Sequence, residues 1–145
     1  MYTEKLHEWF DYWMEIYYRP TVRTPTYENA VYKLRTLKKF LPDMALQEVD
    51  EQILQRTLNC LMDNNYAKST IKQMKSLLNI SLGKAVKLRL IPFSPADSLE
   101  LPEARTKKVI ALSPGQQQQL EQACRDVLYG DYIIFLLYTG LRRGE

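Results

Sequence analysis

The chain has 145 residues, 46% of them hydrophobic and 26% charged, which suffices for one ordinary domain or for a small domain and part of another. This balance argues against disorder, and no apolar run approaches the roughly 20 residues that a membrane-spanning helix needs. The N-terminus lacks the basic-then-apolar pattern of a secretory signal, so a cytoplasmic location is expected. Cys60, Cys124 and the single histidine, His7, lack the spacing of a metal site, and we expect no metal and no other cofactor.

Four helices are predicted in the first 90 residues, because hydrophobic residues recur there at three- and four-residue spacing and do not alternate with period two. The first is expected to stop at Arg19-Pro20, the second at Pro42, and the fourth to run toward Leu90. The predicted N-caps are Thr3, Thr24, Asp50 and Ser69. The residues expected in the core include Leu6, Trp9, Phe10, Trp13, Ile16 and Tyr17 of the first helix and Ile71, Met74, Leu78, Leu82 and Ala85 of the fourth. His7 is expected on a solvated helix face.

The pattern changes after residue 91, where three prolines interrupt it. Ser113-Pro-Gly-Gln116 then predicts a capping box that opens a further helix through Cys124. Another helix is predicted from about Asp131 to Tyr138, ended by Thr139-Gly140. The sequence therefore predicts an all-α protein with a compact four-helix domain at 1–91, an interdomain linker at 92–111 and the start of a second domain at 112–145.

Positive charge is concentrated in the middle of the chain. Residues 1–67 carry a net charge of −2, residues 68–108 of +6 and residues 109–145 of −1. No acidic residue occurs from Lys68 to Ile91, and one side of the fourth helix carries Lys72, Lys75, Ser76, Asn79 and Lys87. We expect these residues to contact double-stranded DNA, with the lysines on phosphates and Asn79 near a base edge. A solvated helix face is the alternative.

Residues suited to phosphate contact also occur in two other segments. Arg23, Thr24 and Thr26 stand at the start of the second helix, where hydroxyls and unpaired N–H groups suit a phosphate, although a solvated surface explains them equally well. Arg105, Lys107 and Lys108 lie near the end of the linker and are expected along a DNA backbone.

Arg142 follows an apolar helix and a Thr-Gly break, a setting that can hold a guanidinium rigidly at a domain surface. Such a group can bind two phosphate oxygens and stabilise charge that develops when phosphorus is attacked. A structural arginine is the alternative from the residues alone.

Tyr138-Thr-Gly-Leu-Arg-Arg-Gly-Glu145 resembles the first catalytic-arginine motif of the tyrosine recombinases, or phage-type integrases. Residues 1–90 resemble the family's SAM-like core-binding domain, and Leu112-Ser-Pro-Gly-Gln-Gln117 resembles the start of its catalytic domain. The resemblance implies that Arg142 is a catalytic phosphate ligand, and it assigns no such role to Arg143. It also implies DNA integration and recombination through a 3′-phosphotyrosyl intermediate, without a metal, by a family associated with mobile elements that assembles as a tetramer on DNA.

The later catalytic residues of the family have no counterpart up to residue 145, so the chain is expected to end inside the catalytic domain. None of its ten tyrosines stands in the nucleophile's context, and Tyr132 and Tyr138 are expected in a core. This fragment alone is therefore expected to bind DNA without cleaving it, and its own oligomeric state, monomeric or otherwise, is left open. The alternatives are a non-enzymatic helical DNA-binding regulator and a helical protein-interaction module.

Overall fold

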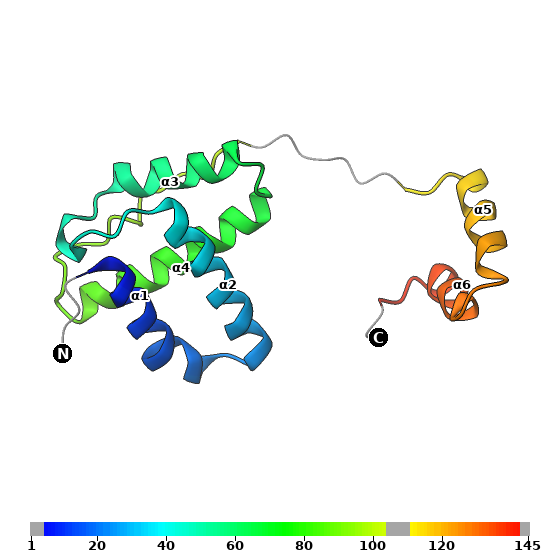
Figure 1. Ribbon diagram of the computed structural model, residues 1–145, viewed down its shortest axis with the longest axis horizontal. Helices are drawn as coiled ribbons and strands as arrows, with labels where there is room; N and C mark the ends of the chain where they lie inside the picture. The colour runs from blue at the N-terminus through cyan, green and yellow to red at the C-terminus, as the bar shows by residue number, and fades with distance from the viewer. Residues whose placement is uncertain (1–4, 104–110, 143–145) are drawn as a thin grey trace. The chain divides into compact units, whose positions relative to one another are not determined.

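A computed structural model describes residues 5–103 and 111–142, and Figure 1 shows their arrangement. The chain divides into two compact units, residues 1–105 and residues 106–145, which are treated separately below. The main helices are α1 (Leu6–Trp13), α2 (Thr24–Phe40), α3 (Glu51–Asp63), α4 (Lys68–Lys87), α5 (Pro114–Cys124) and α6 (Gly130–Thr139). No strand occurs among the described residues, and the predicted all-α fold is confirmed.

Helices α1 to α4 surround a single hydrophobic core in the first unit (Figure 1). Trp9, Phe10 and Trp13 of α1 are almost completely buried, as their spacing predicted. Helix α4 contributes the longest buried face, and the five residues predicted there are all enclosed. Helix α2 packs against both α3 and α4, so that its N-terminal half lies beside the middle of α4.

The first helix continues as a π-helix, η1 (Met14–Tyr18), and then as a short 3-10 turn, η2 (Arg19–Thr21). The Arg19 amide donates to the Met14 carbonyl, five residues back, as in a π-helical turn. The wider turn shifts the residues that follow out of the α-helical register. Met14, four residues after Phe10, is buried, whereas Ile16, predicted in the core, is half exposed.

The helix N-termini agree only in part with the predicted caps. Asp50 caps α3, since its carboxylate accepts a hydrogen bond of 2.7 Å from the Ile53 amide. Thr24 and Ser69 do not cap, because each already lies inside the helix that it was expected to precede. The cap positions of α2 and α4 are Arg23 and Ala67, and neither makes a side-chain hydrogen bond there. Thr3 lies outside the described residues.

The stretch from Ile91 to Leu101 packs back onto the helices, although its prolines suggested an extended linker from residue 92 onward. Ala96 and Leu99 are buried in the shared core. The Gln55 side chain donates to the Glu100 carbonyl and accepts from the Glu100 amide, at 3.1 and 2.9 Å. Side-chain burial and these two hydrogen bonds together hold the stretch against α3.

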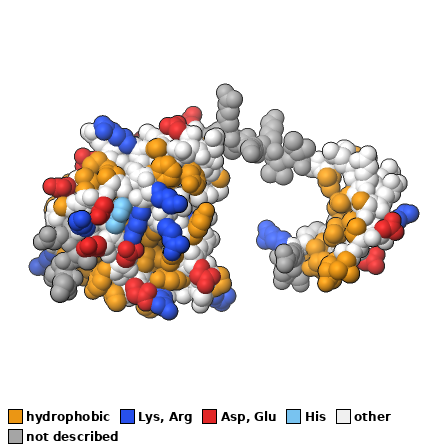
Figure 2. Space-filling model, viewed as in Figure 1, with side chains coloured by type: hydrophobic (Ala, Val, Ile, Leu, Met, Phe, Trp, Pro, Cys, Tyr) orange, Lys and Arg blue, Asp and Glu red, His pale blue; other side chains and the backbone are white. Residues whose placement is uncertain are grey.

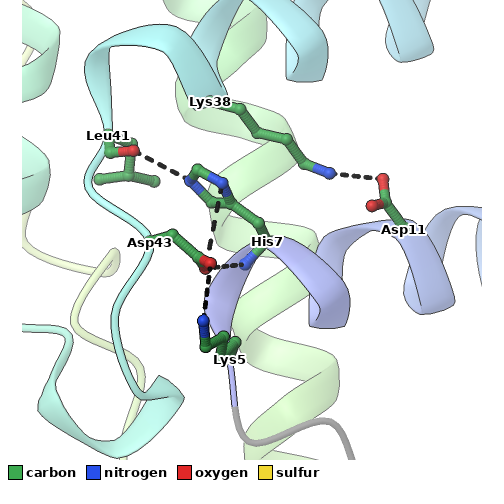
Figure 3. A network of polar contacts seen from close by, with 6 residues as sticks. All are labelled: Lys5, His7, Asp11, Lys38, Leu41 and Asp43. Carbon is green, nitrogen blue, oxygen red and sulfur yellow. Dashed lines mark hydrogen bonds and ion pairs between the residues drawn. The ribbon is translucent and has the colours of Figure 1, made fainter.

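His7 belongs to a network that joins α1 to the segment after α2, shown in Figure 3. Its Nε2 lies 2.9 Å from the Leu41 carbonyl oxygen, and its amide donates to Asp43 at 3.3 Å. Lys5 pairs with the same carboxylate at 3.5 Å. The expectation of a solvated His7 is therefore wrong, because the ring is only 22% exposed and faces the chain segment that follows α2.

The second unit is a pair of helices. Ser113 and Gln116 form the predicted capping box of α5, with hydrogen bonds of 3.3 and 2.9 Å. A β-carbon on Gly130 would stand 1.6 Å from the Cys124 carbonyl oxygen, so the turn between the helices requires glycine. Many hydrophobic side chains of this unit are exposed and gather together on its surface (Figure 2). Tyr132 and Tyr138 are among them, at 45% and 67% exposure, contrary to the predicted core positions.

No helix in the described ranges combines the length and the apolar character that crossing a bilayer requires.

Replacement of Asp50 by alanine should lower the free energy of unfolding by about 1 kcal/mol, because the Ile53 amide loses its acceptor. Urea unfolding followed by the fluorescence of Trp9 and Trp13 reports on this unit. The matched control is Ser69→Ala, which should cost less than about 0.5 kcal/mol because Ser69 is exposed within the first turn of α4. Equal losses in the two variants would contradict this assignment of the caps.

The Asp43 network should make the first unit sensitive to acid. Burial alone would raise the pKa of Asp43, but the His7 amide, the His7 ring and Lys5 outweigh it and hold the pKa below its ordinary value. A carboxyl with a lowered pKa stabilises the fold above its unfolded pKa of about 3.9, and this contribution is lost as the pH falls through the folded value.

The free energy of unfolding should therefore fall below about pH 4, and Asp43→Asn should make that fall shallower. Urea titrations at several pH values measure it. Asp97→Asn, at an exposed position outside the network, is the control. An unchanged pH dependence in Asp43→Asn would refute the role of this carboxylate.

Candidate nucleic-acid interface

A groove runs between α4 on one side and α2 with η1 and η2 on the other; we call it the α2–α4 groove. It consists of two hollows, of about 280 and about 540 Å³, which share Tyr18 and Ile80. The first is lined by Tyr18, Thr26, Asn29, Ala30, Lys33, Gln73, Ser76, Leu77 and Ile80. The second is lined by Trp13, Tyr17, Tyr18, Thr21, Asn79, Ile80, Gly83, Lys84 and Lys87. No carboxylate is among these lining residues.

Four residues proposed from the sequence line this groove, and they come from two helices. Thr26 of α2 and Ser76 of α4 face the same hollow, although they are 50 positions apart in the sequence. Asn79 and Lys87 line the second hollow. The packing of α2 on α4 therefore brings two separately predicted patches together.

Two lysines of the groove contact neutral partners. Lys33 donates to the Asn29 side-chain oxygen at 2.6 Å. The Lys84 ammonium lies 4.2 Å from the centre of the Tyr17 ring, a cation–π contact with an uncharged partner. On the face of the first unit shown in Figure 2, acidic and basic side chains lie intermingled. The lining of the groove carries lysines and no carboxylate, a composition that favours an anionic ligand.

Asn79 lies in the groove with an unsatisfied polar atom. Its Oδ1 is enclosed by protein and has no hydrogen-bond partner among the described residues. Burying an amide oxygen without a partner costs stability, so this arrangement needs a reason beyond core packing.

The other predicted residues of this unit lie elsewhere. Lys72 is exposed on α4 without lining either hollow, and Lys75 donates its ammonium to the Leu99 carbonyl. This hydrogen bond directs Lys75 toward the stretch that packs on α3 and α4. Arg23 and Thr24 are exposed at the start of α2, just before the groove-lining Thr26. Arg105, Lys107 and Lys108 fall outside the described residues.

The sequence reasoning missed several residues that line the groove. Ile80 and Lys84 stand four and eight positions after Ser76, so helical spacing alone would have placed them on the same face. Tyr17 was predicted in the core and Tyr18 was assigned no role, yet both lie in the π-helical turn and line the groove. Helical spacing could therefore have identified the further residues of α4, whereas the packing of η1 beside α4 could not be predicted from spacing.

Arg142 follows the left-handed Gly140, whose φ is +67° and whose amide donates to the Leu136 carbonyl at 2.9 Å. This glycine ends α6 and turns the chain away from it, as expected from the Thr-Gly break. The Arg142 side chain is exposed. Arg143 and Glu145 lie outside the described residues.

Tyr138, near the end of α6, is tied to α5. Its hydroxyl donates to a Glu121 carboxylate oxygen at 2.8 Å, and Gln117 donates to the same oxygen at 2.9 Å. The two hydrogen bonds lower the pKa of Glu121, and the bond to Glu121 with its negative charge raises the pKa of Tyr138. A phenol held protonated in this way is a poor nucleophile, which supports a structural role for Tyr138.

Within the described ranges no three His, Cys, Asp or Glu side chains come together as metal ligands would.

The substitution Glu121→Gln should lower the pKa of Tyr138 toward the ordinary value of about 10, because the phenolate no longer faces a carboxylate. An NMR titration of ring-labelled tyrosine measures this pKa, with Tyr138→Phe to identify the signal. Asp126→Asn, at an exposed position in the same unit, should leave it unchanged. A Tyr138 pKa unaffected by Glu121→Gln would rule out this hydrogen bond in solution.

Comparison with solved structures identifies the same fold in integrases. The Tn1549 transposon integrase in complex with circular intermediate DNA aligns with a TM-score of 0.79 and 19% identity over 97% of this chain and 48% of its own. A lambda integrase dimer bound to a COC' core site aligns with a TM-score of 0.73 and 19% identity over 84% of this chain and 42% of its own. The chain thus spans less than half of either integrase.

An integrase-like domain from Bacillus cereus aligns with a TM-score of 0.62 and 24% identity, over 74% of this chain and 93% of its own. No curated protein matches the chain at a significant level. The family model described as "Phage integrase SAM-like domain" matches residues 5–101, which is more than half of the chain and includes all four helices of the first unit. The protein therefore belongs to the phage integrase SAM-like domain family, as the resemblance of its sequence implied.

Proposed function

We propose that the α2–α4 groove binds duplex DNA and that the chain is the DNA-binding part of a site-specific tyrosine recombinase. The observation that carries this proposal is the lining of the groove. It gathers Lys33, Lys84 and Lys87 with hydroxyl and amide side chains and includes no carboxylate. A phosphate backbone is the polyanion that such a surface suits.

The dimensions of α4 support this proposal. A helix of 20 residues is about 30 Å long, and the major groove of DNA is wide enough to admit one α-helix. Ser76 and Gly83 are small, and a β-carbon on Gly83 would meet nothing within 4 Å, so the outer side of α4 is open to close approach. The lysines would contact phosphates on the rims while Asn79 and Gln73 reach base edges.

The solved relatives support the choice of partner. These structures include lambda integrase bound to a core site and, as a tetramer, to a Holliday junction, and Tn1549 integrase bound to circular intermediate DNA. We propose double-stranded DNA as the partner of this chain and a tetramer on DNA as its assembly.

Arg142 is proposed as a phosphate ligand of the catalytic centre. It follows directly on the Gly140 turn, as the Thr-Gly break in the sequence predicts, and a guanidinium fits two phosphate oxygens. Strand cleavage through a phosphotyrosine would need a tyrosine activated as a nucleophile. None of the ten tyrosines stands in the sequence context of the family's nucleophile, so we propose that the chain as given binds DNA without cleaving it.

Replacing Lys84 and Lys87 by glutamine should weaken DNA binding and reduce its dependence on salt. Each lost phosphate contact lowers the slope of log affinity against log salt concentration by about 0.9, so the double variant should lose about 1.8. Fluorescence anisotropy of the full chain with a 30-base-pair duplex, at five salt concentrations, measures the slope.

The matched control replaces Lys39 and Arg56, two exposed cations outside the groove, by glutamine. It removes the same charge and should keep most of the slope. Equal losses in the two double variants would mean that net charge and not the groove determines binding. No salt-dependent binding by the parent chain would favour the protein-interaction module instead.

A further inference from the structure

Ile80 lines the α2–α4 groove, but its side chain can neither bind a phosphate nor contribute to the buried core. It is 53% exposed, although it stands in the middle of α4, whose opposite face forms the core. It lines both hollows of the groove. Ser76 and Lys84 precede and follow it by one helical turn, so a hydrophobic side chain interrupts an otherwise polar face.

We infer that Ile80 reads the 5-methyl group of thymine in the major groove, an inference that rests on the proposed binding of DNA by this groove. Each base pair presents a distinct edge there, and thymine is the only standard base that presents a methyl group. An aliphatic side chain cannot form hydrogen bonds with a base edge, but it can bury that methyl group. The residue would therefore favour A·T pairs at the position that it faces.

The surroundings of Ile80 favour contact with a base over contact with another protein. The lysines that line the groove come from both of its sides, Lys33 from α2 and Lys84 and Lys87 from α4. They would bind phosphates, and an aliphatic residue among them would then face the base edges.

The test compares two duplexes, an alternating A·T duplex of 30 base pairs and the same duplex with uracil in place of every thymine. Uracil lacks the methyl group, and the alternating sequence presents it in every binding register, so the natural target need not be known. Anisotropy titrations of the full chain should show about fourfold tighter binding to the thymine duplex, as expected for one buried methyl group.

Ile80→Ala should abolish this preference and bind both duplexes with nearly equal affinity. Ile80→Val, which keeps two methyl groups, should retain part of it. Ile16→Ala is the matched control, because Ile16 is 50% exposed and lines neither hollow. Ile16→Ala should keep the full preference for the thymine duplex. Uracil can also change the stiffness of the duplex, but such a change would affect binding by all variants equally.

A preference for thymine that persists in Ile80→Ala, or no preference in the parent chain, would overturn this assignment while leaving DNA binding by the groove intact. Failure of the parent chain to bind either duplex would overturn the proposed function, and the reading of thymine with it. Near-ultraviolet circular dichroism of each variant verifies that the exposed substitutions preserve the fold.

Discussion

Seven residues of α4 are buried in the core, and this single packed face determines what the rest of the unit presents to solvent. A helix buried along one side can expose only the other, and α2 lies beside that exposed side because it packs on α4 as well. The groove is therefore a consequence of core packing. Its polar side chains are positioned by helices whose own rotation is fixed by the burial of Leu78, Leu82 and their neighbours.

The ion pairs found among the described residues of the first unit all lie outside the groove. Lys38 pairs with Asp11 at 2.5 Å, and Arg19 pairs with Glu15 at the same distance. Inside the groove, Lys33 and Lys84 contact an amide oxygen and an aromatic ring. A neutral partner orients an ammonium without cancelling its charge, so the attraction for a distant anion is retained. Net charge understates this effect, because the whole chain carries only +3.

The sequence predicted the helices well because each buries one stripe of hydrophobic residues at helical spacing. It also placed Ser76, Asn79 and Lys87 on one side of α4, since that side follows from periodicity alone. It could not show that Thr26 would join Ser76, because their proximity depends on how two helices pack. Helical spacing also assigned Lys75 to this side of α4, but its ammonium donates to the Leu99 carbonyl. A hydrogen bond to a carbonyl far along the chain cannot be predicted from local sequence spacing.

The π-helical turn of η1 connects the core of α1 to the aromatic wall of the groove. A π-turn corresponds to one residue inserted into an α-helix. The extra residue is accommodated within the wider turn, so Trp13 before it and Tyr18 after it both line the second hollow. A regular α-helix with the same number of residues would turn the side chains after Met14–Tyr18 by about 100° relative to Trp9 and Trp13. The hydrogen-bond pattern of this one turn therefore links the packing of α1 in the core to the aromatic side of the groove.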